Sequence, residues 1–506
     1  MGVPLRDHQT EHVNRLVSTM AWSTSSFDMS TMGLGKTYTT IECTLRLGLK
    51  TMFVICPVSM EKKWRELSKG FGVSDVTITS FAGLRSTGSR QPKHGFLRKV
   101  SVLENGVAEE FFEPTDKFRK AVEGGIMVVV DEVHNLKNNS EQYRACKTLT
   151  DLIHGSEQEG KSRCMLLSGT PIDKEEQTVR MLRLMGLITE KRLVAHRGSD
   201  KAVEFPGAVH LVNLCRERDP GTVSRILREN PTGNTLEVIR LCHILFRDVV
   251  CKFWVSTMPS PPTLFEMDAK NGYYKIHEER TRVHLQYYIE QLHSKSGFMG
   301  ITGTVDGEGV VNIEGGKLGA IIKCLEGIEQ SKIPIFERLV RETLVKYPNC
   351  KICVGLNYVQ RTLLGLVDRL RDLRPEMITG ETSKAARDSI IERFQEQNLK
   401  SRILIANIKC LSTGIDLDDK TGNFPRIIFA SPNYTIVDLH QFSRRFLRVD
   451  SKSAPVFRFV YGDCGRKEKS ILNALVRKSQ IMHEILREQD AAGMKFPGEY
   501  EDEIEQ

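Results

Sequence analysis

The stretch Ser30-Thr31-Met32-Gly33-Leu34-Gly35-Lys36-Thr37 decides the fold, because its chemistry needs a tight turn that opens a helix. A glycine-rich turn lets backbone N–H groups converge on phosphate oxygens, and the helix that follows adds its positive N-terminal end. Lys36 can then reach the β- and γ-phosphates of a nucleoside triphosphate, and the Thr37 hydroxyl can bind Mg²⁺. The general pattern has one more glycine, where this chain has Ser30. The nucleotide-binding residues predicted from this turn are Met32, Gly33, Leu34, Gly35, Lys36 and Thr37.

A second motif, VVVDEVH at 128–134, places two carboxylates at the end of an apolar run. A carboxylate pair is usually a solvated surface feature, but one that follows a buried strand is suited to catalysis. Asp131 can hold Mg²⁺ through a water molecule, and Glu132 can orient the water that attacks the γ-phosphate. The metal-binding candidates are therefore Thr37 and Asp131, and the catalytic candidates are Lys36, Asp131 and Glu132.

Short β-branched runs alternate with helical patterns in the first third of the chain. Strands are expected at 51–56, 77–80, 126–130 and 164–167, with helices at 13–20, 36–47 and 60–67. This alternation is typical of a parallel sheet wrapped by helices, with ligands beyond the carboxyl ends of the strands. The sequence therefore predicts an α/β fold with both motifs at strand ends.

The alternation stops near residue 175 and resumes near Ile333. Helices are expected between them at 234–253 and 273–292. Beyond them, strands are expected at 351–356, 402–406, 427–430 and 456–460, with helices at 361–370 and 384–395. The predicted organisation is a first α/β domain at 1–190, a mostly helical connecting segment at 191–330, a second α/β domain at 331–490 and an acidic tail at 491–506.

Two arginines in the second domain, Arg445 and Arg448, are candidates for a catalytic role. Positive charge on the transition state of phosphoryl transfer can supply a factor of about 10³ to 10⁵ in rate. The segment QFSRRFLR at 441–448 is expected to be helical, with these two side chains on one face. The alternative is a solvated basic face. A cleft between two α/β domains would favour catalysis, with one domain binding ATP and the other delivering arginine.

The ordered set of motifs resembles that of superfamily-two helicases and translocases, most closely the Swi/Snf-like ATPases. The segments that carry the resemblance span most of the chain: LRDHQ at 5–9, MGLGKT at 32–37, CPVSMEKKW at 56–64, TSF at 79–81, DEVHNLKN at 131–138, SGTP at 168–171, ITG at 378–380 with Arg387 and Phe394, STGIDL at 412–417 and QFSRRFLR at 441–448. Two departures stand out. Arg444 occupies a position where the last motif normally has glycine, and KICVGLNY at 351–358 is recognisable as motif IV mainly by its place.

The resemblance implies two RecA-like domains, ATP as substrate, Mg²⁺ as cofactor and nucleic acid as partner. It assigns an adenine contact to Gln9, adds Gly414 and Asp416 to the nucleotide-binding set, and gives Arg445 and Arg448 catalytic roles. It also implies that SGTP, as motif III, couples the nucleotide state to the grip on nucleic acid. It extends to compact ATPases of large DNA viruses, such as the poxvirus nucleoside triphosphate phosphohydrolase.

Composition sets further limits. The 506 residues carry 72 Lys+Arg against 64 Asp+Glu, a net charge of +8, which permits an anionic partner without identifying one. No apolar run approaches the roughly 20 residues of a spanning helix, and the first residues do not resemble a secretory signal. Twelve scattered cysteines suit a reducing compartment. We therefore expect no membrane partner and an intracellular protein, in the cytoplasm or virion if viral and in the nucleus otherwise.

The function expected from sequence is an ATP-dependent translocase or helicase on nucleic acid, with duplex DNA favoured and single-stranded DNA or RNA as alternatives. A strand-separating or RNA helicase uses the same motifs. A catalytically silent subunit of a transcription or remodelling complex is a further alternative, and a transcription-complex protein is a candidate partner. Between Arg444 and Lys469 eight basic residues face three acidic ones, so part of the positive charge is expected to gather there.

Overall fold

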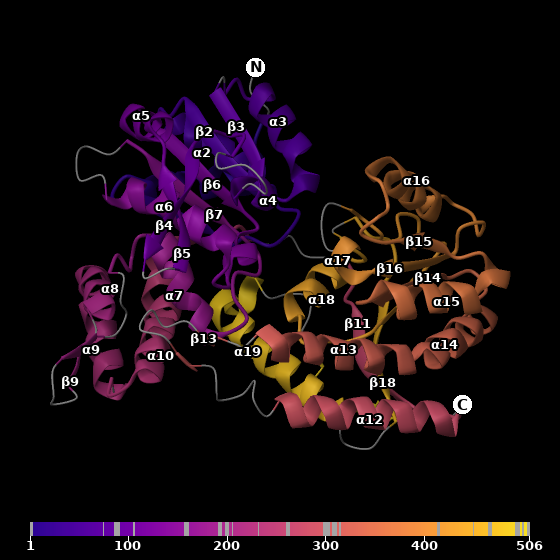
Figure 1. The fold of residues 1–506 in the computed structure, drawn as a ribbon. Helices are drawn as coiled ribbons and strands as arrows, with labels where there is room; N and C mark the ends of the chain where they lie inside the picture. Colours follow the sequence, from indigo (N-terminus) through magenta and orange to yellow (C-terminus); the bar gives the residue numbers. More distant parts are fainter. Residues whose placement is uncertain are drawn as a thin grey trace. The chain divides into compact units, whose positions relative to one another are not determined.

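A computed structural model shows that the chain forms two compact units (Figure 1). The first unit comprises residues 1–260, 304–311 and 481–490, and the second comprises 261–303, 312–480 and 491–506. The structure describes residues 4–502 except 74, 86–91, 105–106, 156–160, 191–194, 198–201, 205, 231, 260–263, 297–303, 306–310, 313–314, 412–414, 449, 464–467, 491–495 and 498–499. Within these residues, no helix is long and apolar enough to cross a bilayer.

The first unit is built on a six-stranded sheet whose strands all run parallel, in the order β10-β1-β7-β6-β2-β3. Its strands are β1 (Ser25–Asp28), β2 (Thr51–Cys56), β3 (Asp75–Ser80), β6 (Ile126–Asp131), β7 (Arg163–Leu167) and β10 (Val255–Ser256). Four of these match the predicted strands, whereas β1 and β10 were missed. The parallel α/β fold expected for this part of the chain is confirmed.

Alternate residues of the central strands enter two separate cores, one on each face of the sheet. In β2, Met52 and Val54 pack with α1 (Asp7–Met20), α2 (Lys36–Arg46) and α3 (Glu61–Gly70). Phe53 and Ile55 pack on the other face with α5 (Asp116–Gly124), α6 (Glu141–Gly155) and α7 (Glu175–Leu184). Both faces are therefore covered, which explains why these strands are apolar throughout.

A group of helices follows α7 and joins the same core. Its members are α8 (Pro206–Arg218), α9 (Pro220–Glu229), α10 (Thr235–Leu245), the π-helical turn η3 (Phe246–Val250) and α11 (Cys251–Phe253). Side-chain caps start two of these helices, since Asp219 accepts a hydrogen bond from Thr222 N and Asn234 accepts one from Glu237 N. The helix predicted at 234–253 corresponds to α10, η3 and α11 in succession.

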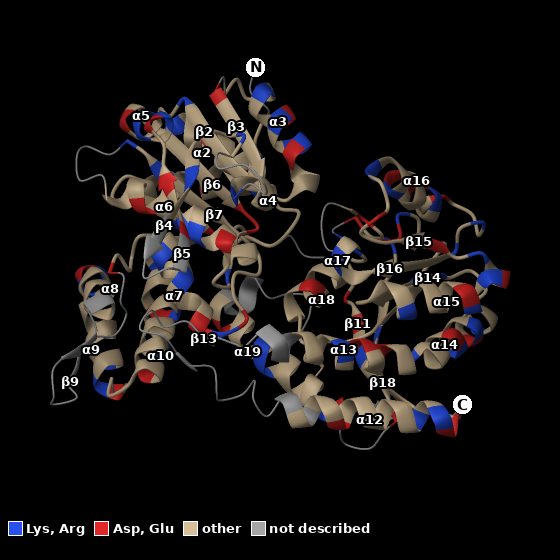
Figure 2. Ribbon diagram, viewed as in Figure 1, with Lys and Arg blue, Asp and Glu red and all other residues tan. Residues whose placement is uncertain are grey.

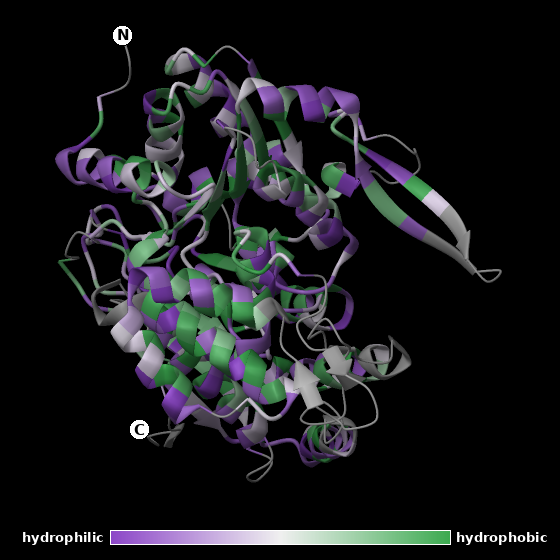
Figure 3. Ribbon diagram, turned by 90° about the vertical axis from the view of Figure 1, so that its left-hand side faces the viewer, coloured by the Kyte–Doolittle hydropathy of each residue, from purple (hydrophilic) through white to green (hydrophobic). Residues whose placement is uncertain are grey.

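An antiparallel hairpin, formed by β4 (Leu97–Glu104) and β5 (Val107–Pro114), is inserted before α5. Figure 3 shows it as a ribbon that extends away from the hydrophobic strands of the sheet. Leu97 and Phe112 bury its base in the core of the unit. The remaining short elements of this region are η1 (Val58–Met60), α4 (Phe81–Arg85), η2 (Val133–Leu136), β8 (Ala195–Arg197) and β9 (Ala202–Glu204).

The second unit contains a seven-stranded sheet, again wholly parallel, in the order β15-β16-β14-β17-β18-β11-β19. Its strands are β11 (Asp268–Tyr274), β14 (Lys351–Leu356), β15 (Glu376–Ile378), β16 (Ile403–Asn407), β17 (Arg426–Ala430), β18 (Val456–Gly462) and β19 (Tyr500–Asp502). Ile352 and Val354 pack against α14 (Ile333–Lys346) and α15 (Leu364–Arg369). The second parallel-sheet domain is thus confirmed.

The other elements of the second half are α12 (Glu279–Ser296), β12 (Thr304–Val305), β13 (Val311–Asn312), α13 (Gly315–Ser331), η4 (Val359–Leu363), η5 (Arg371–Leu373), α16 (Lys384–Gln395), α17 (Ile408–Leu411), α18 (Ile436–Ser443) and α19 (Lys469–Asp490). Helix α16 has the predicted bounds.

One expectation for a segment outside the sheets needs correction. The helix predicted at 273–292 begins only at Glu279, because Tyr273 and Tyr274 belong to β11, which pairs with β18 over seven residues. The acidic tail at 491–506 contains β19, which adds to the edge of the sheet beside β11. The segment at 191–330 is shared between the two units: α8 to α11 lie in the first, and α12 and α13 lie in the second.

Candidate active site

The phosphate loop connects β1 to α2 in a conformation that requires glycine. Gly33 and Gly35 have φ values of 86° and 93°, in the left-handed region. A Cβ atom added to Gly35 would lie 2.3 Å from Nε2 of Gln9. Gly35 is also the N-cap of α2, which begins at Lys36. The loop thus presents the start of a helix where the sequence predicts phosphate binding.

The Lys36 side chain lies inside this loop and is 9% exposed. Its ammonium group donates to the carbonyl of Ser30 at 2.8 Å and to that of Thr31 at 3.2 Å. Thr37, the other residue predicted to act on phosphate and metal, is buried at the start of α2. The structure therefore brings the predicted cation and hydroxyl to one place at the helix start.

Gln9, predicted to contact adenine, is held against the same loop. Its Nε2 atom donates to the Leu34 carbonyl at 3.0 Å, and its Oε1 atom accepts from the backbone N–H of Arg6 at 3.0 Å. The side-chain amide therefore links the first turn of α1 to the loop. Its role toward adenine stays a prediction.

A buried ion pair contacts the start of the phosphate loop, and no sequence pattern predicts it. Asp28, the last residue of β1, lies 2.9 Å from His12 of α1, and both side chains are 0% exposed. Asp28 also accepts a hydrogen bond from the backbone N–H of Ser30. Burial raises the pKa of Asp28, but the charge and hydrogen bond of His12 and the charge of Lys36 hold that pKa below its usual value.

Ser30, which stands where the general pattern has glycine, is bonded through its side chain. Its Oγ atom accepts from the backbone N–H of Met258 at 2.8 Å. Two residues earlier, Ser256 contacts the ring of His12 at 3.1 Å. The segment after β10 and the helix α1 therefore fix the loop together, which explains how serine serves at this position.

The two carboxylates lie at the end of β6, as predicted. Burial and the negative charge of Glu132 raise the pKa of Asp131 to about 6, against the indole hydrogen bond of Trp64 and the charge of Lys36. Glu132 adopts a left-handed conformation with φ 58° and ψ 52°. Such a backbone is strained for a non-glycine residue, and residues strained in this way cluster at active sites and switch regions.

A polar chain runs from Glu132 to motif III, the segment SGTP at 168–171. The Nδ1 atom of His134 lies 3.3 Å from Oε2 of Glu132 and 3.2 Å from Oγ of Ser168. Ser168 in turn donates its backbone N–H to the Asp28 carbonyl at 3.1 Å. A Cβ atom at Gly169 would lie 3.2 Å from the Ser30 carbonyl, so this segment packs directly on the phosphate loop. The motifs of the first unit therefore form one contiguous cluster.

In the second unit, the structure brings the predicted arginines to the segment that contains Asp416. Arg448 Nε donates to Asp416 Oδ1 at 2.6 Å, and the Arg445 carbonyl accepts from the backbone N–H of Leu417 at 2.8 Å. Asp416 thus bonds arginine in this structure, while its nucleotide role stays a prediction. Gly414 lies outside the described residues.

The expectation that Arg445 and Arg448 share one face of a helix is wrong. Helix α18 ends at Ser443, and the chain continues in tight turns in which Arg445 N bonds the Phe442 carbonyl. The buried ring of Phe446 packs edge-on against Phe442 at 5.2 Å, which draws the chain back onto the core. Both arginines therefore follow the helix instead of belonging to it.

Arg444, which stands where the motif normally has glycine, is half-buried. Burial, together with the charge of Arg448, lowers its pKa to about 10. The positive surplus expected from Arg444 to Lys469 is partly neutralised, since Arg458 pairs with Asp268 at 2.7 Å. Figure 2 likewise shows basic and acidic residues interspersed along helices of both units.

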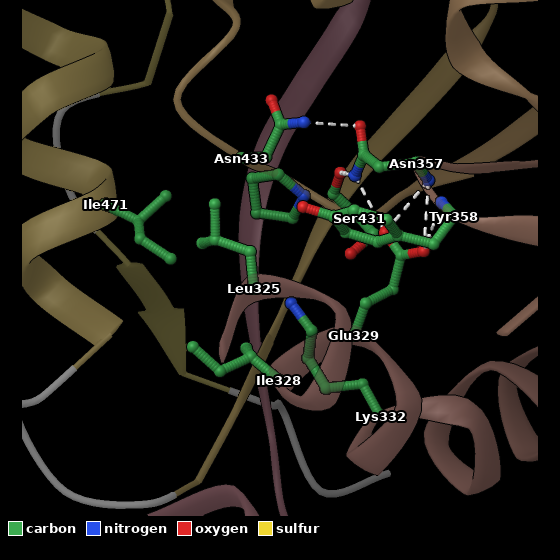
Figure 4. A pocket seen from close by; sticks show the side chains of 10 residues that line it. Leu325, Ile328, Glu329, Lys332, Asn357, Tyr358, Ser431, Asn433 and Ile471 are labelled. Atoms are coloured by element: carbon green, nitrogen blue, oxygen red, sulfur yellow. Dashed lines mark hydrogen bonds between the residues drawn. The ribbon is translucent and has the colours of Figure 1, made fainter. Parts of the chain in front are cut away.

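A small pocket at the carboxyl ends of β14 and β17 marks the predicted motif IV (Figure 4). Glu329 is buried there and accepts hydrogen bonds from the backbone N–H groups of Asn357 and Tyr358 and from Asn357 Nδ2. Burial raises the pKa of Glu329 against these bonds. Lys332, one helical turn later, forms a fully buried pair with Glu468 at 2.9 Å. Glu329 lies outside KICVGLNY, so that segment alone could not reveal its bonds to Asn357 and Tyr358.

Magnesium suits the donors at the first site better than a metal that needs a full protein cage. Among the described residues, no group of three or more His, Cys, Asp or Glu could hold a metal ion. Mg²⁺ is usually bound by one or two protein oxygens together with substrate phosphates and water. The Thr37 hydroxyl and the Asp131 carboxylate, with Lys36 close enough to influence the pKa of Asp131, fit that mode of binding.

Comparison with known proteins agrees with the motifs. Residues 8–226 match the SNF2-related domain family. This match covers the first part of the chain and supports the resemblance of the ordered motifs to the Swi/Snf-like superfamily-two ATPases.

Two relatives are similar to the chain. The "Putative ATP-dependent RNA helicase L364" of Acanthamoeba polyphaga mimivirus is 22% identical over 487 residues, covering 93% of this chain and 81% of its own length. The chromodomain-helicase-DNA-binding protein 1-like of Mus musculus is 30% identical over 181 residues, covering 34% of this chain and 18% of its own length. The chain thus resembles a relative from a large DNA virus along nearly its whole length.

Two solved structures also align with the chain. The SWI2/SNF2 ATPase core of Sulfolobus solfataricus in complex with dsDNA is 14% identical, with a TM-score of 0.32 over 96% of this chain and 97% of its own. The core domain alone is 18% identical, with a TM-score of 0.31 over 97% of this chain and 92% of its own. At these scores the overlays support no conclusion about this chain.

Proposed function

We propose that the chain is a nucleic-acid-stimulated ATPase that hydrolyses ATP to ADP and phosphate while tracking along duplex DNA. The observation that carries the proposal is the contiguous cluster in the first unit. There, Lys36 lies inside a glycine-rich loop, and motif III connects that loop through His134 to Glu132.

In this proposal the loop binds the phosphates of ATP. The Lys36 ammonium group, now satisfied by two carbonyls of the loop, exchanges them for phosphate oxygens. Thr37 and Asp131 hold Mg²⁺, which when bound neutralises the charge on the phosphates. Glu132 accepts a proton from the attacking water, in the strained geometry that its left-handed backbone imposes. Gln9, bonded to Leu34, positions the loop relative to α1.

Motif III gives the cluster a route for communication. A change at the γ-phosphate would alter the position of Glu132. His134 contacts both Glu132 and Ser168, and Gly169 packs on the phosphate loop, so these residues connect Glu132 to the loop. The resemblance of SGTP to motif III implies that this segment couples the nucleotide state to the grip on nucleic acid. The roles of Arg445, Arg448, Gly414 and Asp416 in hydrolysis rest on motif order and stay predictions.

An RNA helicase is the second candidate, favoured by the name of the mimivirus relative. A role in viral transcription or genome handling is part of the proposal, since that relative is viral. A catalytically silent subunit would need no intact hydrolytic cluster, so the geometry around Lys36 and Glu132 favours an enzyme.

The experiment that tests the proposed activity is the steady-state ATPase rate of the wild-type chain beside Lys36→Ala. The variant removes the cation from the loop and should reduce turnover to background, because the phosphates lose their charge partner. Equal rates for the two proteins would show that hydrolysis, if any, does not occur at this site.

A further inference from the structure

Trp64 occupies a place that the proposed mechanism does not yet use. It lies on α3, in the segment CPVSMEKKW that follows β2, and its side chain is 0% exposed. Its ring belongs to the core formed with Val54, Cys56 and Val129. The sequence favours a structural role for it beneath the turn after β2, and packing alone would account for a phenylalanine there just as well.

The indole nitrogen has a specific partner. Nε1 donates to Oδ2 of Asp131 at 2.8 Å, and both groups are buried. An indole N–H can only donate, and a hydrogen bond from it to a buried carboxylate is charge-assisted. A carboxylate offers about four acceptor positions, so the indole takes one and leaves the others for metal-bound water.

The position of this bond fixes the direction of the carboxylate. Asp131 ends β6, and β2 pairs with β6 through Ile55 and Val130, so α3 follows the neighbouring strand after the short turn η1. One rigid ring, held by the core on its apolar sides, therefore sets the rotation of the side chain on the adjacent strand. Groups that hydrogen-bond a ligating carboxylate typically affect metal affinity or activity by about 10–100-fold.

We propose that Trp64 is a positioning residue for magnesium, holding the Asp131 carboxylate in the orientation that Mg²⁺ and nucleotide need. The inference rests on the proposed function, since it concerns the metal of the same site. It assigns to the helix after β2 an indirect part in metal binding, exerted through Asp131, in addition to any contact that its exposed residues make with nucleic acid.

The test compares Trp64→Phe with wild type. Phenylalanine keeps an aromatic ring in the core and removes only the N–H donor. Binding of a fluorescent, non-hydrolysable ATP analogue is measured in EDTA and across a Mg²⁺ titration. We expect unchanged affinity in EDTA, and a Mg²⁺ concentration for half-maximal enhancement that rises by roughly 10–100-fold. Trp254→Phe is the matched control, because Trp254 is 3% exposed and lies beside β10 at the other edge of the sheet, and it should behave as wild type.

A second measurement needs no substitution at the site. The three tryptophans, Trp22, Trp64 and Trp254, allow 5-fluorotryptophan labelling with three resonances to follow by ¹⁹F NMR. Adding Mg²⁺ in the presence of the analogue should shift the Trp64 resonance most.

The inference would be overturned if folded Trp64→Phe showed the Mg²⁺ dependence of wild type, or if the Trp64 resonance did not shift when Mg²⁺ is added. Neither result would contradict the proposed ATPase activity. Wild-type protein that binds nucleotide no better with Mg²⁺ would overturn both.

Discussion

At the scale of single residues, the candidate active site depends on a few positions where the backbone conformation or one hydrogen bond restricts which residue type can be accommodated. The sequence predicts site roles for Lys36, Thr37, Asp131 and Glu132 because phosphate-binding loops and strand-terminal carboxylates have fixed spacing, and these roles stay predictions. It could not identify partners whose bonds join distant segments. His12 lies on a helix and Asp28 at the end of the following strand, and Trp64 and Asp131 are separated by 67 positions. No local pattern encodes such pairs.

Gly35 should not tolerate even a methyl group. In Gly35→Ala, the new Cβ meets Gln9 Nε2 at 2.3 Å, so Gln9 must give up its bond to Leu34. Loss of such a hydrogen bond costs about 1 kcal/mol, and nucleotide affinity should fall roughly fivefold. The measurement is ATP-analogue binding by fluorescence anisotropy.

Gly48→Ala supplies the control for that comparison. Gly48 also has a positive φ, 71°, but nothing lies within 4 Å of its added Cβ. Both alanines carry the strain of a left-handed backbone, about 1–2 kcal/mol. If the two variants lost affinity equally, contact with Gln9 would not be the cause.

Glu132→Gln should separate binding from hydrolysis. The amide keeps the size of the side chain but cannot accept the proton of the attacking water. We expect nucleotide binding close to wild type and turnover slower by about 10²–10⁴-fold, measured by single-turnover phosphate release. Turnover at the wild-type rate would show that Glu132 is not the general base.

At the scale of elements, long apolar strands and amphipathic helices were predictable, while short or tertiary-dependent ones were not. β2, β6 and β14 were found because both of their faces are buried. β1 reads SSFD, and its serines bond to the backbone of Met185 and Trp254 instead of marking a turn. The end of α18 depends on the packing of Phe446, which no helical periodicity reveals.

The contact between α7 and α10 should make the first unit sensitive to acid. His243 is 3% exposed and bonds Thr178 at 2.9 Å. Burial, with the charge of Arg247, lowers its pKa to about 4. Its unfolded-state pKa is about 6.5, so the unfolded chain binds a proton first as pH falls, and the stability present above pH 6.5 is lost down to pH 4.

Between pH 7 and pH 5 this group should remove about 2 kcal/mol from the free energy of unfolding. All three tryptophans, Trp22, Trp64 and Trp254, lie in the first unit, so urea unfolding followed by their fluorescence reports that unit. His243→Gln should show a correspondingly smaller loss over the same pH interval. An identical loss in the variant would assign the acid sensitivity to other groups.

At the scale of the whole molecule, composition indicated the class of partner but did not show where on the protein that partner would bind. The +8 net charge permitted nucleic acid, yet the expected basic cluster at 444–469 is partly paired within the second unit. The two parallel sheets followed from the alternation of strands and helices. The division of 191–330 between the units did not, because β10 and β11 join different sheets through pairings with residues far away in sequence.

Nucleic-acid affinity should fall steeply with salt and vary little with sequence, since phosphate contacts release counterions. Lys63, exposed on α3, is one candidate contact in the segment CPVSMEKKW. Lys63→Ala should reduce the slope of log affinity against log salt by about 1. Affinity that does not change with salt would contradict the proposed partner.

The most direct test of the central claim is the ATPase rate measured in parallel without nucleic acid, with single-stranded DNA, with duplex DNA and with RNA. The account predicts stimulation that is largest with duplex DNA and absent in Lys36→Ala. Stimulation by RNA alone would contradict the choice of DNA, and a rate unaffected by every nucleic acid would contradict a nucleic-acid-dependent ATPase.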